Sequence, residues 1–556
     1  MNTVNNEHDI TKSVDDVHME ETRAGIITDN ADHLHRRLSI RQIQLLAIGG
    51  SIGTGLFINI GNGLRQGGPL SLLLGFSLYS LLLGLINNGI AEMTVLHPVA
   101  GGFVRLAGKW VDDAFGFMAG WNFFFYEALG IPFEITAVNV VLSFWRDDIP
   151  IAAVCSGCIL IYFTLNILAV RVYGEAEFWL SGGKVALLAI LYSFTFVTMV
   201  GGNPQHDAYG FRYWHDPGPM SEFLSSGSFG KFQGFLSAVW SACFAVVGPE
   251  FVSMAAAEAK HPRVYIKTAF KTIYWRFGVF FILGALCVGV VIPYNDTTLV
   301  AILSGSEGNS GTAAASPYVI AMNNMKISVL PHLTNALLVT SIFAAGNTYM
   351  YCATRTLYSL ALEGRAPSFL TKCTKQGVPI FCVLIVICFA FLSFLQISDG
   401  SANALTILTS LITGGGLINY ITMCVTYIFF HRACRAQGVD RRTFPYYGRF
   451  QPYCAWIGLV GESIILLLYG YSSFTPWDVS TFFSYYTMAI IAPVLFTAWK
   501  IIKHTRAVKP LEADLTWDRP ITDAYEAALS SQPVGFWTEM CQMVGLRRRK
   551  PHTGMD

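Results

Sequence analysis

Charged side chains are scarce in this sequence. Of its 556 residues, 13% are Asp, Glu, Lys or Arg, whereas 53% are hydrophobic. Soluble domains contain about 25% charged residues, so a large part of this chain is expected to face lipid. The formal net charge is only +1 and no basic domain stands out, which argues against a nucleic-acid-binding protein.

The sequence also lacks the patterns of an enzyme or of a disulfide-bonded secreted protein. Its twelve cysteines lie mostly inside apolar runs, as free buried cysteines do. No nucleophile–base pair and no cluster of metal ligands occurs at a workable spacing, so we expect no enzyme, no metal and no cofactor. The first forty residues are polar and lack the apolar core of a cleavable signal peptide, so we expect internal segments to drive membrane insertion.

Long apolar segments recur along the rest of the chain. A helix needs about 20 apolar residues to cross the hydrocarbon core, and its backbone groups must be paired within it. The sequence therefore predicts an all-α integral membrane protein with twelve transmembrane helices, at 43–63, 70–96, 115–145, 150–170, 178–200, 232–257, 274–294, 330–354, 379–397, 404–430, 455–472 and 483–502. This divides the chain into an N-terminal tail (1–40), a twelve-helix domain (41–503) and a C-terminal tail (504–556).

Lysine and arginine are distributed unevenly between the predicted loops. With the N-terminus in the cytosol, clusters at 260–276 and 432–449 fall inside, and the external loops contain only Arg65, Arg146, Arg212, Lys231 and Lys326. Because positive residues favour the cytoplasmic side, both termini are predicted to be cytosolic. The acceptor sequence Asn295-Asp-Thr then lies outside, which makes Asn295 a candidate N-glycosylation site.

Glycines interrupt the first predicted crossing. The stretch AIGGSIGTGLFI, residues 47–58, contains Gly49, Gly50, Gly53 and Gly55, and each glycine costs a helix interior about 1 kcal/mol relative to alanine. A glycine loop for nucleotides needs a preceding strand and a βαβ unit, and neither is present in the sequence pattern. Two interpretations stay open. One is a close helix-packing surface at Gly49-x-x-x-Gly53, and the other is a broken membrane helix whose free amide groups bind an anionic group.

The sixth predicted crossing contains a second interruption. Gly248-Pro249-Glu250 lies in the middle of SACFAVVGPEFVSMAAAEA, and proline removes a backbone donor and clashes with the preceding turn. Breaks in crossings 1 and 6 fit a five-plus-five inverted repeat with two additional helices. A zwitterionic amino acid suits such a site, because its carboxylate can bind amides of residues 51–55 and its ammonium can face carbonyls of residues 244–247.

Four motifs in register resemble the fungal amino acid permeases, which are the yeast amino acid transporter family of the amino acid–polyamine–organocation superfamily. They are IGGSIGTGLF, FRYWHDPG, GPEFVSMAAAEAKHPR and RACRAQGVDRRTFPYY, and the similarity extends from about Arg36 to Lys503. The resemblance implies a plasma-membrane proton symporter of L-amino acids that has the inverted-repeat transporter fold and works by alternating access.

The resemblance also implies roles for single residues. The stretch 51–55 would bind the substrate α-carboxylate, and Phe244 would gate the site or stack on the substrate. Glu250 matches the acidic residue after the break in crossing 6. Lys184 matches a lysine that, in related proton-coupled carriers, stands where sodium-coupled relatives hold an ion. The predicted substrate-binding residues are Ser51, Ile52, Gly53, Thr54, Gly55, Phe244, Val247 and Glu134, and those predicted for proton coupling or gating are Lys184 and Glu250.

Ionisable side chains inside predicted crossings are functional candidates by default, but each has a structural alternative. Lys184 lies about a turn from the start of its crossing and has the alternative of reaching the lipid interface. The alternative for Glu250 is to accept hydrogen bonds from neighbouring helices, and for Glu134 it is to brace a proline kink. Glu92 and Glu258 fall near the cytoplasmic ends of crossings 2 and 6, where a structural or gating pair with loop arginines is equally expected.

Two further functions stay open besides amino acid import. One is a nutrient sensor that keeps the carrier fold without net transport, and the other is a carrier of polyamines or other organic cations, which would dispense with a carboxylate site. Permeases of acidic amino acids in this family have an amide where this chain has Glu134, so a dicarboxylate preference is not supported. The expected partners are an L-amino acid, protons and membrane lipid.

Overall fold

The computed structural model describes residues 36, 38–146, 148–167, 170–304, 316–374, 377–399, 401–474, 476–517, 519–529 and 532–543. Helices dominate this part of the chain, and the β-bridges found in it are two isolated ones, Leu38 with Ala259 and Phe474 with Trp477. The predicted N-terminal tail (1–40) lies almost entirely outside the described residues, and so do residues 544–556 of the C-terminal tail.

The first predicted crossing breaks at its glycine-rich stretch. Helix α2 (Ile40–Ser51) ends at Ile52, whose backbone is extended (φ −111°, ψ 97°). A π-helical turn, η1 (Gly55–Asn59), follows and leads into α3 (Ile60–Leu96). Helix α3 then bends at Gly68, which has a φ of 80° and precedes Pro69, so it contains the end of one crossing and all of the next.

The sixth predicted crossing breaks where proline and glycine predict it. Helix α9 (Gly227–Ala245) is followed by α10 (Pro249–Met254), and between them Val246 is extended (φ −89°, ψ 102°). Gly248 has a φ of 153°, which L-residues with a side chain rarely adopt. Pro249 is the first residue of α10, where its missing N–H costs no helical hydrogen bond.

The remaining elements form a bundle of long helices with short helices at its two ends. The long elements are α5 (Asp113–Leu142), α6 (Ile151–Ile167), α7 (Val170–Met199), α11 (Pro262–Arg276) with η3 (Phe277–Ile282) and α12 (Leu283–Val291), α15 (Leu330–Leu362), α16 (Ile380–Ala390) with η5 (Phe391–Leu395) and α17 (Gln396–Asp399), α18 (Ser401–Ala436), α19 (Tyr453–Leu468) and α20 (Val479–Lys503). The short ones are α4 (Gly102–Trp110), α8 (Arg212–His215), η2 (Ala256–Glu258), α13 (Thr297–Ser304), α14 (Pro317–Asn324), η4 (Ser368–Thr371), η6 (Arg441–Thr443), η7 (Tyr471–Ser473), α21 (Arg519–Ala528) and α22 (Phe536–Met543).

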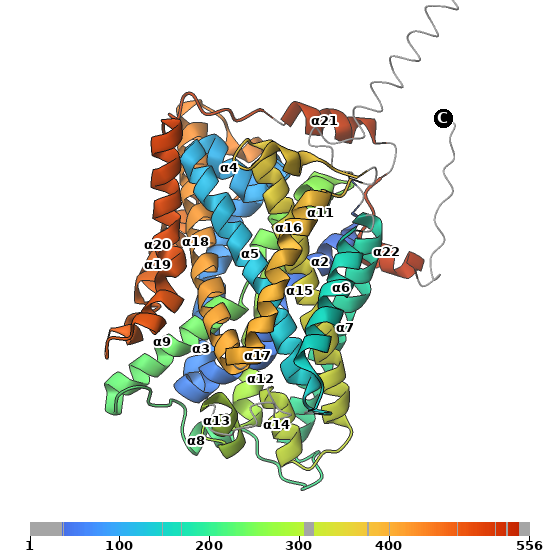
Figure 1. Cartoon of the computed structure of the whole chain (residues 1–556), viewed down its shortest axis with the longest axis vertical. Helices are drawn as coiled ribbons and strands as arrows, with labels where there is room; N and C mark the ends of the chain where they lie inside the picture. The colour runs from blue at the N-terminus through green and yellow to red at the C-terminus, as the bar shows by residue number, and fades with distance from the viewer. Residues whose placement is uncertain are drawn as a thin grey trace, which may run out of the picture.

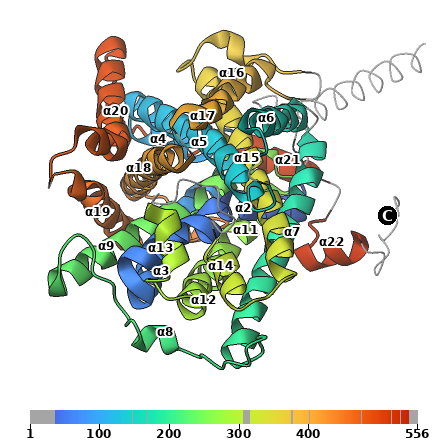
Figure 2. The same cartoon turned by 60° about the horizontal axis from the view of Figure 1, so that its bottom comes forward.

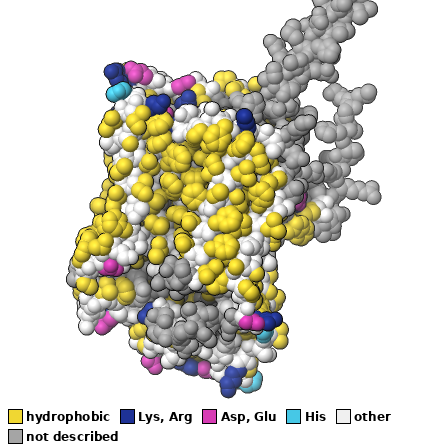
Figure 3. Space-filling view, viewed as in Figure 1, with side chains coloured by type: hydrophobic (Ala, Val, Ile, Leu, Met, Phe, Trp, Pro, Cys, Tyr) yellow, Lys and Arg dark blue, Asp and Glu magenta, His cyan; other side chains and the backbone are white. Residues whose placement is uncertain are grey.

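The outer surface of the bundle is apolar. Within the described residues, nine helices are long and apolar enough to cross a bilayer, and shorter apolar helices occur at Ile151–Ile167 and Ile380–Leu395. Large apolar side chains on the long helices are exposed, among them Leu81, Trp179 and Leu467 at 65%, 67% and 73%. Figure 3 shows that such side chains cover the flank of the molecule, while charged ones gather near its two ends. Water would penalise this surface and lipid would not, so the chain is a multi-pass membrane protein.

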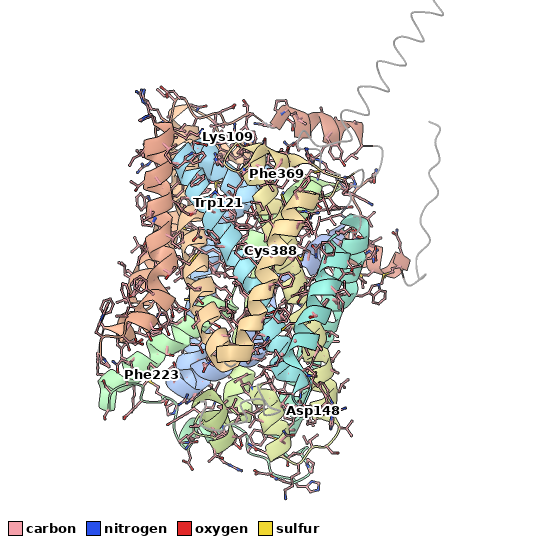
Figure 4. The ribbon with its side chains drawn as sticks, viewed as in Figure 1. Lys109, Trp121, Asp148, Phe223, Phe369 and Cys388 are labelled. Carbon is pink, nitrogen blue, oxygen red and sulfur yellow. The ribbon has the colours of Figure 1, made fainter. Side chains whose placement is uncertain are left out.

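The two ends of the bundle differ. The end that carries α4 and α21 is here called the tail side, and the end that carries α8, α13 and α14 is the loop side (Figure 1). Lys109 lies near the first and Asp148 near the second, with Trp121 and Cys388 on the flank between them (Figure 4). The chain enters α2 from the tail side, because the guanidinium of Arg36 lies 4.5 Å from the ring centroid of Tyr525 in α21.

The centre of the bundle positions the broken helices. Helix α5 packs against α15 and α18, and α2 packs against α7 and α15. Other helices surround α2, α5, α15 and α18, and α7 and α20 lie on the outside in the tilted view of Figure 2. The two breaks therefore lie inside protein, where irregular backbone is tolerated in a membrane.

Candidate functional site

The two helix breaks lie side by side. A Cβ atom added at Gly55, next to the first break, would lie 2.9 Å from Cα of Ala245, the last residue of α9. A Cβ atom added at Gly248 would lie 4.0 Å from Cβ of Ser51. The stretch predicted to bind a carboxylate is therefore placed against the residues predicted to face an ammonium.

Close packing also explains the glycines of crossing 1. A Cβ atom at Gly49 would lie 2.0 Å from Oε1 of Glu177 on α7, and one at Gly53 would lie 2.8 Å from Oε1 of Glu134 on α5. Close packing of these glycines is thus confirmed, and binding of an anionic group at the break stays a prediction. The helix breaks after Ser51, and glycines on either side of the break leave room for a buried carboxylate.

Glu134 contacts the broken stretch directly. It is buried in α5, and its Oε2 accepts a hydrogen bond from the Thr54 hydroxyl. The hydroxyl of Ser51, by contrast, donates to the Ala47 carbonyl of its own helix over 2.8 Å. Glu134 therefore lies at the predicted site, while the Ser51 hydroxyl is turned back into α2.

Lys184 reaches the same helix from the opposite wall. Its side chain is fully buried in α7, and its ammonium group donates to the backbone carbonyl of Gly49. An interfacial lysine would be exposed, so the structure excludes that alternative. Its partner Gly49 is three residues before the break at Ile52, where the backbone of crossing 1 changes direction, so the positive charge of Lys184 lies close to the break.

Glu250 is hydrogen-bonded at the break in crossing 6. Its Oε2 accepts the amide of Gly248 over 3.1 Å, and its two oxygens lie 2.9 and 3.0 Å from the Tyr420 hydroxyl of α18, which donates to them. The structural alternative, a hydrogen-bond acceptor for a neighbouring helix, is thus present. A role in coupling stays a prediction.

A polar cavity of about 350 Å³ begins at the first break and extends toward α13 on the loop side. Thr54 and Phe133 line it, and the Phe133 ring contacts the Phe244 ring edge to face, with the centroids 5.1 Å apart. Of the predicted substrate residues, Thr54 lines the cavity and the others are buried behind its wall. Phe244 is therefore placed between the cavity and the break in crossing 6.

Most of the cavity wall was not foreseen from the sequence. Asn59, Asn62 and Gln66 contribute amides, and Tyr469 and Tyr485 come from the last two long helical segments. None of the described residues that line the cavity is charged. Single amides and tyrosines in apolar crossings give no sequence signal that separates a cavity wall from ordinary packing.

The sequence analysis also did not name two buried residues near Lys184 as candidates. Glu177 of α7 accepts from Asn347 of α15 over 3.2 Å, and both side chains are buried. A signal for Glu177 did exist in the sequence. It precedes Lys184 by seven residues, about two helical turns, so the two side chains share one face of the helix.

Two ion pairs lie on the tail side. Glu92 pairs with Arg441 over 2.7 Å, and Glu258 pairs with Arg355 over 2.9 Å. Glu92 thus pairs with an arginine of the loop between α18 and α19, as expected, whereas Glu258 pairs with an arginine inside α15 and not with a loop arginine. These pairs thus lie on the tail side, and the cavity extends toward the loop side.

A helical bundle with two broken crossings at its centre and a polar cavity at one break has the construction of a membrane transporter. The sequence model of the family described as "Amino acid permease" matches residues 42–511. The chain therefore belongs to the amino acid permease family. It is a transporter of that family and not an enzyme, and the resemblance inferred from the four motifs is confirmed.

Several relatives show how the family varies. The chain is 42% identical to the general amino acid permease AGP2 of Saccharomyces cerevisiae over 503 residues, covering 88% of this chain and 84% of the relative. It is 33% identical to the dicarboxylic amino acid permease of the same yeast (90% and 82% covered) and 36% identical to the proline-specific permease of Emericella nidulans (84% and 85%). Because the names of these relatives differ in substrate, similarity leaves the preferred side chain open.

A solved structure supports the fold. A crystal structure of the Eremococcus coleocola manganese transporter matches with a TM-score of 0.51 at 14% identity, covering 88% of this chain and 95% of that one. At this identity the match bears on the fold alone.

Proposed function

We propose that this chain imports L-amino acids across the plasma membrane by proton symport and alternating access. The observation that carries the proposal is Lys184, a buried ammonium bonded to the carbonyl of Gly49 next to the break in crossing 1. A fixed positive charge next to the break can replace the charge of a bound cation, and a lysine can release and take up a proton during the transport cycle.

The helices fit the proposed count of twelve crossings. Helix α3 supplies the end of crossing 1 and all of crossing 2, and the shorter helices α6 and α16 supply crossings 4 and 9. Helices α19 and α20 would be the two crossings outside a five-plus-five inverted repeat. Because the described ends of the chain meet where Arg36 lies over the Tyr525 ring of α21, we propose that the tail side is cytosolic.

Substrate binding is proposed at the facing breaks. The amides of Ser51, Ile52, Gly53, Thr54 and Gly55 would take the α-carboxylate, as helix ends do with anions. The ammonium group of the substrate would face the backbone carbonyls of Val247 and its neighbours, and Phe244 would separate the site from the cavity. Glu134, bonded to Thr54, would set which substrate side chains are accepted.

Uptake measurements in a permease-deficient fungal strain test the proposal. Accumulation of a labelled amino acid should rise as external pH falls, collapse with a protonophore and ignore replacement of sodium by choline. Lys184→Ala should lose accumulation against a gradient but keep exchange of substrate, whereas Lys231→Ala, at an exposed position near the start of α9, should keep both. If Lys184→Ala still accumulates substrate with the same pH dependence, Lys184 has no part in coupling and Glu250 becomes the candidate.

Competition separates the alternative functions in the same assay. Twenty amino acids and spermidine are each tested against the labelled substrate. A polyamine carrier would be inhibited by spermidine and by no amino acid. A sensor would show no accumulation of any of them while the protein is present at the cell surface.

A further inference from the structure

A buried carboxylate on α7 lies beside the lysine proposed for coupling. Glu177 is fully buried; its Oε1 accepts from the Ser181 hydroxyl over 2.8 Å and its Oε2 from the Asn347 amide of α15 over 3.2 Å. Asn347 in turn accepts from Asn166 of α6 over 2.9 Å. This network fixes the carboxylate from three helices, so its position is set by tertiary structure and not by its own rotamer freedom.

Glu177 and Lys184 contact the same residue of the broken crossing. The space where Gly49 would carry a Cβ atom is taken by Oε1 of Glu177, and the carbonyl of Gly49 accepts the ammonium of Lys184. Gly49 belongs to α2, the half of crossing 1 on the tail side. The two opposite charges of α7 thus bracket one residue of a segment that alternating access has to move.

The buried charge of Lys184 has few polar groups that compensate it. The ammonium of Lys184 donates a hydrogen bond to the Gly49 carbonyl and interacts electrostatically with Glu177 and Glu134. Glu134 already accepts from Thr54 in the broken stretch. A buried charge without a compensating partner is strongly destabilising, so Lys184 depends on a nearby carboxylate, and Glu177 is the one on its own helix face.

We propose that Glu177 is the positioning residue for Lys184. Its carboxylate balances the lysine charge and, through Asn347, ties α7 to α15, so that the charged lysine holds Gly49 and the inner half of crossing 1 in place. Loss of the lysine proton then leaves α2 free to move relative to α7. This inference rests on the proposed proton coupling and adds a second residue to it.

Paired variants test the proposal in cells that carry the full chain. Glu177→Gln should lower accumulation of a labelled amino acid at least about tenfold, and Glu177→Asp, which keeps the charge, should restore a large part of it. The double variant Glu177→Gln/Lys184→Met removes both charges. It should recover exchange and surface level relative to Glu177→Gln alone, while accumulation stays lost.

The matched control is Glu175→Gln. Glu175 lies two residues earlier on α7, is partly exposed and pairs with Arg41 near the tail side, so its removal should change accumulation less than about twofold. If Glu177→Gln fails to reach the surface, the surface level of the double variant tests whether Glu177 and Lys184 act as a pair. A restored surface level supports the pair, and no restoration overturns it.

The outcomes separate this inference from the proposed function. If the unmodified chain shows no pH-dependent accumulation of any amino acid, the proposed function fails. If the unmodified chain accumulates substrate and Glu177→Gln does so equally, Glu177 has no positioning role and only this inference is overturned. Independent effects of Glu177→Gln and Lys184→Met in the double variant would overturn it as well.

Discussion

At the scale of single residues, this protein uses glycine to bring helix backbone next to charged side chains. Gly53 lies against Glu134 and Ala345, and a Cβ atom there would be 2.8 and 2.9 Å from their nearest atoms. Such distances are shorter than van der Waals contact, so any side chain at this position has to displace Glu134 or the backbone itself. The absence of a side chain at Gly53 thus admits the Glu134 carboxylate next to the break.

Gly53→Val is therefore expected to abolish uptake while the protein still reaches the surface. Valine would push against Glu134 and occupy the backbone site proposed for the substrate carboxylate. The control is Gly182→Val on α7, where an added Cβ atom meets nothing within 4 Å. Uptake is measured with a labelled amino acid and normalised to surface protein. Unchanged uptake in Gly53→Val would leave helix packing as the only role of this glycine.

Glu134→Gln is expected to change substrate preference. A buried carboxylate at the site repels a second substrate carboxylate, and an amide of the same shape does not. Uptake of glutamate should therefore rise relative to uptake of leucine, by up to about tenfold if the repulsion is near 1.4 kcal/mol. The two rates are compared in the same cells. An identical order of preference before and after the change would place Glu134 outside the pocket.

At the scale of elements, the C-terminal segment after α20 covers the tail side. Val508 donates to the Val111 carbonyl over 2.8 Å, and Trp110 donates from its ring to the Asp514 carbonyl over 2.9 Å. His97, which follows α3, is stacked on Trp517 with the ring centroids 5.9 Å apart. The end of crossing 2, helix α4 and the C-terminal segment thus share one small aromatic cluster.

Stability of this cluster is expected to fall in acid. Burial lowers the pKa of His97 from its ordinary 6.5 to about 4, so the folded state binds a proton less readily than the unfolded state. The contribution of neutral His97 to the free energy of unfolding is fully present above pH 6.5 and is lost as the pH falls toward 4. At pH 5 the loss is about 2 kcal/mol. The thermal unfolding midpoint of the purified protein should drop between pH 7 and pH 5. His97→Phe should reduce that drop, and an equal drop in both proteins would contradict the assignment.

At the scale of the whole molecule, the chain has two distinct polar ends separated by an apolar flank (Figure 3). The described parts of both tails meet on one side, where Arg41 of α2 contacts Glu539 of α22. Asn295 is exposed in the loop between α12 and α13, on the other side. The fold therefore separates the tails from the predicted glycosylation site, whichever way the protein is inserted.

Labelling from one side of the membrane fixes the orientation. Asn295→Cys should react with an impermeant maleimide in intact cells, and Lys509→Cys should react only after permeabilisation. The unmodified chain, which contains twelve cysteines, is the background control. The reverse pattern would place the tails outside and would contradict the prediction from lysine and arginine.

Local features of the sequence were enough to predict the class of protein, the apolar helices and the two helix breaks. Hydrophobic length, glycine density and Gly-Pro act within a few residues, so their effects can be predicted before the fold is known. The contacts of Gly49 with Glu177, of Gly53 with Glu134 and of Lys184 with a backbone carbonyl could be found only in the folded chain. These contacts join residues far apart in the chain, and which apolar face meets which neighbour depends on the packing of the whole bundle, because lipid makes every outward face equally acceptable.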